Sequence, residues 1–250
     1  MTALSETFGP IRVGMIEDGV AELAMLDAEG QNGMSAVWGK AFIAALHRAA
    51  DLPQARVLLV SGLPDYFCTG ATLSVLKELA DGYLPPSELT LGRRLIGFPV
   101  PVVAAAQGHA IGGGFALLLS CDMAVISEAS RYGANFMTLG ITPGMGTTRL
   151  VEDVFGRAVA HELLYTGDLH RGRYFAGSGA FNAVAPASEV RERALRLARG
   201  VADKPRDNLI NLKRSLSLPR RKAFEEAMTT EPLMHGLSFP NLDADLWGGL

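Results

Sequence analysis

The stretch Gln107–Ala116, QGHAIGGGFA, places three consecutive glycines between two apolar runs. The run before it, Val100–Ala106, is typical of a buried strand, and the run after it, Phe115–Leu119, lies on a predicted helix. Glycine inside regular structure costs conformational free energy, so three in a row at a strand-to-helix junction indicate a special backbone. The first N–H groups of a helix have no intrahelical acceptor and lie at the positive end of its dipole. This junction is therefore suited to a phosphate, or to an oxyanion that forms during a reaction.

The surrounding residues favour an oxyanion over a phosphate. The phosphate-binding motifs G-x-x-x-x-G-K-[ST] and G-x-G-x-x-G are both absent from this stretch. A second glycine, within Asp65–Leu73 (DYFCTGATL), lies at another strand–loop–helix junction. Two junctions could supply two N–H donors from separate loops, which is what an acyl oxygen needs as it becomes an enolate. Tight packing of a helix against a strand is the alternative reason for the glycines.

The first half of the chain alternates predicted strands and helices. Asp18 and Gly19 lie between two apolar runs, which predicts a β-hairpin. Ser35 is suited to cap a helix that continues to Ala50, because apolar residues follow it at helical spacing. Buried-strand runs at Arg56–Ser61 and Asp122–Ser127, together with the strand before the triplet, are separated by predicted helices. This alternation predicts parallel βαβ units and an α/β fold.

After about Thr147 the pattern becomes mostly helical. The predicted helices cover Thr147–Leu164, Ser188–Ala202, Arg206–Ser215 and Arg220–Met228, with a last helical turn at Pro232–Leu237. The Thr230-Glu231-Pro232 sequence is typical of a helix start, since proline is favoured in the first turn. We therefore expect a core over residues 1–190 and a helical C-terminal part over residues 191–250.

Composition narrows the classes of partner. Of the 250 residues, 48% are apolar and 20% are charged, which is typical of a folded globular chain. The net charge of −3 gives no reason to expect nucleic acid or an anionic membrane as a partner. The two cysteines, Cys68 and Cys121, lack the spacing of metal ligands, so no metal and no cofactor is expected. With no signal peptide predicted, they indicate the reducing cytoplasm.

Three longer stretches carry a family resemblance. They are FCTGATL (Phe67–Leu73), AAAQGHAIGGGFALLLSCDMAVISE (Ala104–Glu128) and YGANFMTLGITPGMGTTRL (Tyr132–Leu150). In this order they resemble the crotonase (enoyl-CoA hydratase/isomerase) superfamily. The resemblance implies a spiral core of ββα repeats with a helical C-terminal part that forms trimers, hence a homotrimer or a dimer of trimers. It also implies an oxyanion hole whose N–H donors are Ala71 and Gly113.

The sequence departs from the hydratases of that superfamily at two positions. The resemblance places the two catalytic glutamates of the hydratases at Ala116 and Phe136, which are apolar here and are expected to line the pocket. Neither side chain transfers protons, so addition of water by the usual hydratase route is not expected. An oxyanion hole in an apolar pocket suits decarboxylation, because loss of CO2 from an acid β or vinylogous to a thioester forms the enolate without a carboxylate base.

Lys77 and His235 are the candidate catalytic residues. Lys77 lies at the edge of the apolar stripe of its predicted helix, and His235 follows Glu231 by four residues, so that Glu231 could orient it. Together with the absence of the two glutamates, these residues make the sequence resemble the decarboxylases of polyketide β-branching. That subgroup converts 3-methylglutaconyl to 3-methylcrotonyl groups on acyl carrier protein. The resemblance implies that Lys77 binds the departing carboxylate and that His235 assists orientation or protonation. Some members carry a tyrosine where this chain has Leu73.

Two other functions stay open from the sequence. One is a different acyl-CoA reaction, such as an isomerisation, with a base that the sequence does not identify. The other is a catalytically silent crotonase fold that serves as an assembly module in a synthase, which the lost glutamates would allow. The poor match to the general family beyond about Leu218 favours a carrier protein over free CoA.

Overall fold

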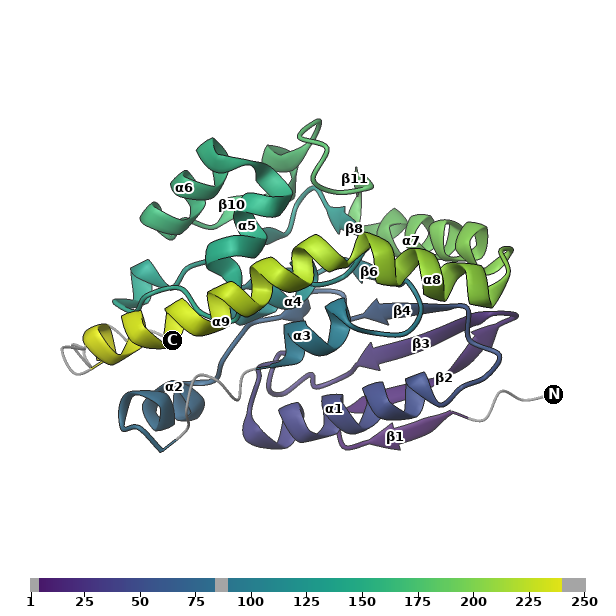
Figure 1. The fold of residues 1–250 in the computed structure, drawn as a ribbon, viewed down its shortest axis with the longest axis horizontal. Helices are drawn as coiled ribbons and strands as arrows, with labels where there is room; N and C mark the ends of the chain where they lie inside the picture. The colour runs from purple at the N-terminus through teal and green to yellow at the C-terminus, as the bar shows by residue number, and fades with distance from the viewer. Residues whose placement is uncertain (1–4, 84–89, 240–250) are drawn as a thin grey trace.

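The computed structural model describes residues 5–83 and 90–239, and its main layer is a seven-stranded sheet (Figure 1). In spatial order the strands are β1 (Glu6–Phe8), β2 (Ile11–Glu17), β3 (Val20–Met25), β4 (Val57–Ser61), β6 (Val102–Ala106), β8 (Met123–Ser127) and β11 (Ala183–Ala185). The first three strands are antiparallel and the others pair in parallel. The predicted hairpin is confirmed, with Gly19 at a φ of +71° in its turn.

A second, four-stranded sheet lies beside the first. Its strands in order are β10 (His170–Arg171), β9 (Arg131–Gly133), β7 (His109–Ile111) and β5 (Tyr66–Cys68). Strands β4, β6 and β8 of the main sheet are each followed along the chain by one of these short strands. The β4–β5 and β6–β7 pairs each lead directly into a helix, α2 (Leu73–Ala80) and α4 (Gly113–Leu119). This succession confirms the predicted α/β class and the crotonase-type ββα repeat.

Helices bury both faces of the main sheet. Helix α1 (Ala36–Ala50) packs on β1–β3, and Ser35 caps it as predicted, with its Oγ accepting from the Trp38 N–H at 3.1 Å. Helix α7 (Ala187–Ala202) packs on β4, β6 and β8 from the other side. Alternate residues of each strand therefore enter different cores, which is why these strands form unbroken apolar runs in the sequence.

The helices after β9 differ from their predicted bounds in two places. The predicted helix Thr147–Leu164 is two helices, α5 (Thr147–Phe155) and α6 (Arg157–Thr166), because Gly156 between them has a φ of +73°. The predicted helix and separate last turn after residue 219 are one helix, α9 (Leu218–Ser238), which crosses the molecule (Figure 1). The expected helix start at Thr230 is therefore wrong, and Pro232 lies inside α9.

Three short helices and the longer helix α8 (Arg206–Leu216) are the remaining helices of the described residues. The short ones are α3 (Leu91–Ile96) and the 3-10 helices η2 (Met137–Leu139) and η3 (Gly172–Phe175). Helix α8 joins α7 to α9. The expected boundary at residue 190 falls inside α7, which packs on the main sheet, so no change of layer occurs there. A trimerisation role for residues 191–250 stays a prediction.

One partly buried carboxylate ties the C-terminal helices to the sheet. Asp122 forms ion pairs with Lys213 of α8 and with Arg220 of α9, the latter at 2.9 Å, and accepts from the Val102 N–H at 2.8 Å. Lys213 is buried, and burial lowers its pKa although Asp122 lies against it. Asp122 therefore opposes the effect of burial on the Lys213 ammonium.

We expect Asp122→Asn to lower the free energy of unfolding by about 3 kcal/mol, because Lys213 would keep a buried charge without a counter-ion. Urea denaturation measures this loss. The control is Glu225→Gln, whose side chain is 54% exposed and pairs with Arg93 at the surface. An exposed pair contributes less than about 1 kcal/mol. Equal losses in the two variants would contradict the role given to Asp122.

Candidate active site

The three glycines of the triplet serve different purposes. Gly112 has a φ of +54°, a conformation that side chains rarely adopt, and it redirects the chain from β7 into α4. A Cβ atom on Gly114 would overlap the carbonyl oxygen of Cys68, so Gly114 lets α4 pack directly on the end of β5. A Cβ atom on Gly113 would instead meet the end of a flexible side chain, the Sδ of Met145, at 2.7 Å. Packing thus explains Gly114, while Gly113 faces a cavity.

The two predicted oxyanion donors lie on adjoining loops. The position of a Cβ on Gly70 lies 3.0 Å from the Gly113 nitrogen, so the two glycine junctions are in contact. Ala71, the next residue, forms an isolated parallel bridge with Met34. Ala71 and Gly113 line the same cavity, and neither N–H has a hydrogen-bond acceptor among the described residues. This arrangement can direct two N–H groups at one acyl oxygen.

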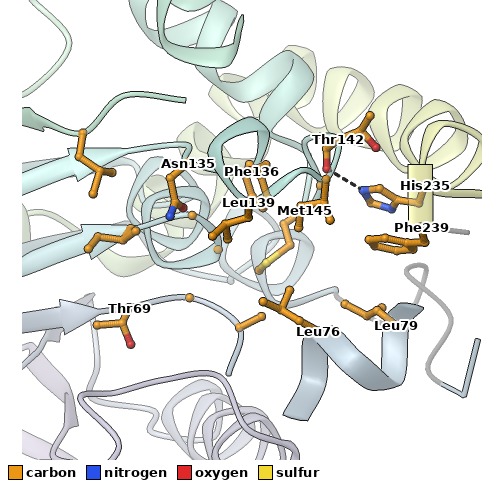
Figure 2. A pocket seen from close by; sticks show the side chains of 18 of the residues that line it. Thr69, Leu76, Leu79, Asn135, Phe136, Leu139, Thr142, Met145, His235 and Phe239 are labelled. Carbon is orange, nitrogen blue, oxygen red and sulfur yellow. Dashed lines mark hydrogen bonds between the residues drawn. The ribbon is translucent and has the colours of Figure 1, made fainter. Parts of the chain in front are cut away.

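The cavity has a volume of about 320 Å³ and lies between α2, the start of α4, residues 135–146 and the end of α9 (Figure 2). Its apolar wall consists of Ala71, Leu76, Leu79, Ile111, Phe136, Leu139, Ile141, Met145, Leu169 and Phe239. Its polar side chains are those of Gln31, Tyr66, Thr69, Asn135, Thr142 and His235. No lysine, arginine, aspartate or glutamate occurs among the described residues that line it. The described wall thus offers no carboxylate base.

Ala116 and Phe136, the positions where the hydratases carry glutamate, lie in different parts of the structure. Phe136 lines the cavity as predicted. Ala116 does not, since it is 1% exposed and belongs to the main core. All residues of α4 from Gly113 to Leu119 are buried, and Ala116 is covered by its neighbours in the main core. The expectation that Ala116 forms part of the pocket wall is corrected accordingly.

His235 lies in the cavity wall and is 6% exposed. Its Nε2 is 3.1 Å from the carbonyl oxygens of both Thr142 and Pro143 (Figure 2 draws one of these bonds). Carbonyl oxygens only accept, so the ring proton is on Nε2. The buried Nδ1 has no hydrogen-bond partner among the residues that the structure describes, and the ring stacks on Phe239 with the ring centroids 5.0 Å apart. Burial lowers the pKa of His235, although the two carbonyls oppose this shift. The ring is therefore neutral, with a free lone pair on Nδ1.

Glu231 does not contact His235 as the sequence suggested. Its carboxylate accepts from the Gly146 N–H at 2.8 Å, the Thr148 N–H at 3.0 Å and the Thr148 hydroxyl at 2.8 Å. These donors lie at the start of α5, where Gly146 offers no capping side chain of its own. Glu231 is 1% exposed, and burial raises its pKa despite these bonds. Glu231 therefore caps α5 from α9.

Lys77 and His235 are not brought together in the structure. Leu76 and Leu79 of α2 turn toward the cavity (Figure 2), and at about 100° per residue Lys77 lies on the opposite side of the helix. Lys77 is exposed and is not among the residues that line the cavity. Within the described part of the chain its ammonium has no ion pair or hydrogen bond. A catalytic role for Lys77 stays a prediction that this geometry does not support directly.

Sequence reasoning missed the segment Thr142–Gly146. Its carbonyls hold His235, and its Met145 has a φ of +59° and lines the cavity against Gly113. A left-handed conformation at a residue other than glycine stores strain of about 1–3 kcal/mol and often occurs at functional sites. The sequence signal for this segment is the pair of glycines on either side of Met145. In the sequence, these glycines contribute only to the family motif.

None of the helices among the described residues is both long enough and apolar enough to cross a membrane. The same residues also contain no group of three or more histidine, cysteine, aspartate or glutamate side chains placed to hold a metal ion.

Comparison with known proteins identifies the class. Residues 15–244 match the model of the enoyl-CoA hydratase/isomerase family. The chain therefore belongs to that family, the crotonase superfamily. Within it the chain is similar to the bacillaene synthase decarboxylase PksI of Bacillus subtilis (strain 168), with 33% identity over 224 residues that cover 90% of each protein.

Solved structures give the same grouping. A chain from a dehydratase/decarboxylase enzyme couple involved in polyketide β-branching superimposes with a TM-score of 0.93, at 30% identity over 99% of this chain and 98% of that one. The ECH2 decarboxylase domain of CurF from Lyngbya majuscula gives a TM-score of 0.88, at 29% identity over 96% of this chain and 99% of that one. The predicted superfamily and decarboxylase resemblance are confirmed, and the chain is a crotonase-family enzyme of the decarboxylase type.

We expect Gly114→Ala and Gly113→Ala to behave differently, although both add one methyl group. The new Cβ at Gly114 would overlap the Cys68 carbonyl, which is backbone, so we expect a loss of about 3 kcal/mol or more in stability. At Gly113 the obstacle is the flexible end of Met145, so that variant should fold with a smaller loss. Circular dichroism with thermal melting checks this. Similar melting temperatures for the two variants would contradict the assignment.

We expect the free energy of unfolding to decrease as the pH is lowered, in part because of His235. Its pKa is lowered on folding, so below the usual histidine value of about 6.5 the unfolded chain binds a proton that the folded chain does not. Stability is thus present above that pH and is lost as the pH falls toward the folded pKa. Urea unfolding of wild type and His235→Asn from about pH 7.5 to pH 5 measures it. A variant whose stability falls as steeply as that of wild type would contradict the expectation.

Proposed function

We propose that the protein decarboxylates a 3-methylglutaconyl-type thioester carried on acyl carrier protein and gives a 3-methylcrotonyl-type thioester in polyketide β-branching. The observation that carries the proposal is the cavity itself. It has two N–H donors at one end, a neutral histidine at the other, and no carboxylate among its described lining residues. The similarity to PksI and to the CurF domain supports this function.

The chemistry follows from charge moving toward the oxyanion hole. The thioester oxygen accepts from the N–H groups of Ala71 and Gly113. When the bond to the carboxylate carbon breaks, CO2 leaves and the electron pair moves through the conjugated system onto that oxygen. The two donors stabilise the resulting dienolate by about 3–4 kcal/mol each. One proton from solvent must then reach carbon: His235 takes it up at Nδ1 and delivers it to the dienolate carbon, which returns the ring to its neutral form.

Lys77 stays the proposed partner of the departing carboxylate. In the structure its side chain lies outside the cavity, on the exposed face of α2. The role therefore requires the four-carbon stem of Lys77 to fold over the edge of α2 when the substrate binds. Helix α2 packs against Phe239 near the end of α9, so its edge lies beside the wall that carries His235.

The proposed partner is an acyl carrier protein whose phosphopantetheine arm brings the thioester to the cavity. The proposed assembly is a homotrimer or a dimer of trimers formed through residues 191–250, and the proposed compartment is the cytoplasm. The enzyme couple of polyketide β-branching to which the chain is similar supports a carrier-bound substrate. Neither nucleic acid nor a membrane is a proposed partner.

We expect His235→Ala to slow formation of the protonated 3-methylcrotonyl product by about 100-fold or more, because it removes the proton carrier. We expect Lys77→Ala to slow CO2 release through loss of carboxylate binding. The assay follows the mass of 3-methylglutaconyl-loaded carrier protein. Lys222→Ala, an exposed lysine on α9, is the matched control and should keep full activity.

Each outcome of this assay has a distinct meaning. Loss or gain of water without loss of CO2 would indicate another thioester reaction, and binding without turnover would indicate an assembly module. Either would overturn the proposed function. Full activity in both Lys77→Ala and His235→Ala would overturn the two catalytic assignments and leave the reaction standing.

A further inference from the structure

Helix α9 carries two buried polar side chains one turn apart that contact the same segment. Glu231 accepts from Gly146 and Thr148 at one end of Thr142–Thr148. His235 donates to the carbonyls of Thr142 and Pro143 at the other end. The segment is thus held by α9 at both ends, and only one of the two contacts belongs to a proposed catalytic residue.

The middle of this segment connects the two halves of the cavity. A Cβ on Gly144 would lie 3.0 Å from the Cε1 of His235, so the ring packs directly on this backbone. The next residue, Met145, has a φ of +59°, and its thioether lies against Gly113. Gly146 has a φ of +84° and donates its N–H to Glu231. The carboxylate therefore anchors the backbone from which both contacts arise.

A glutamate at position 231 of α9 is energetically unfavourable on local grounds. A buried carboxylate is costly, and Pro232 beside it removes a helix hydrogen bond at a cost of about 3 kcal/mol. Three hydrogen bonds and the N-terminal dipole of α5 offset the burial of the charge. Such a group specifies one arrangement of the segment, because a shift of α9 along α5 would leave the carboxylate unpaired.

We propose that Glu231 is a positioning residue for the reaction at His235. By fixing Gly146 and Thr148 it sets the place of the Thr142 and Pro143 carbonyls. These hold the proton on Nε2 and leave Nδ1 free. It also keeps the Met145 thioether against Gly113, at the oxyanion end of the cavity. This inference rests on the proposed role of His235, and Glu231 itself touches neither the cavity nor the substrate.

The test compares Glu231→Ala and Glu231→Gln with wild type on loaded carrier protein. We expect Glu231→Ala to lower kcat by about 10- to 100-fold, as small displacements of a reacting group do, with KM changed by less than about two-fold. Glu231→Gln keeps one acceptor oxygen and should lose less. Nitrogen-15 NMR of labelled histidine gives a readout besides activity. His235 should show the Nε2–H tautomer in wild type and a mixture of tautomers in Glu231→Ala.

Two control variants separate positioning from stability. Asp122→Asn disturbs a partly buried ion-pair network next to the start of β8 and should keep its kcat in the folded protein. Glu225→Gln changes an exposed glutamate on the same helix and should match wild type in both readouts. If Glu231→Ala fails to fold, Thr148→Val removes one donor to Glu231 and takes its place.

A folded Glu231 variant with wild-type kcat and an unchanged tautomer would overturn the proposal and leave Glu231 a structural anchor. The failure of the proposed function looks different. If wild type releases no CO2, the reaction is wrong, and the tautomer of His235 in Glu231→Ala still decides whether Glu231 holds the ring.

Discussion

The contact between Gly114 and the Cys68 carbonyl is the constraint on which the site depends. Because no side chain separates them, α4 begins directly against the end of β5. This contact brings the loop after β5 and the loop after β7 together, and with them Ala71 and Gly113. Strong preorganisation of N–H donors requires such fixed backbone, because flexible donors must be ordered during the reaction. The end of the cavity that carries the two proposed oxyanion donors is thus a product of the ββα repeat itself.

The other end of the cavity depends on packing between distant parts of the chain. Among the described residues, the ring of His235 bonds to backbone carbonyls and stacks on Phe239, and the backbone that offers those carbonyls is itself held from α9. The wall between the two ends is apolar and carries no carboxylate among its described residues. The site therefore combines a rigid local half with a half that exists only when α9 is docked.

Most of the fold could be predicted because its signals are local. Buried-strand runs, the Asp18-Gly19 turn and the Ser35 cap each indicate their own structure. The second sheet was missed because strands of two or three residues show no periodicity. The continuation of α9 through Pro232 was missed because it depends on the tertiary bonds of Glu231, which no helical pattern reveals. For the same reason the sequence placed Glu231 beside His235, whereas the carboxylate reaches α5.

The order of the chain gives this arrangement a consequence during synthesis. Residues 70–113, which carry both proposed oxyanion donors, leave the ribosome well before residues 231–239. The core around the glycine junctions can assemble first, since domains begin to fold from the N-terminal side. Until α9 arrives, the start of α5 lacks its cap and the wall around Met145 is open to water. A nascent chain would thus form the half of the site with the proposed oxyanion donors early, and would close the other half only with its last described helix.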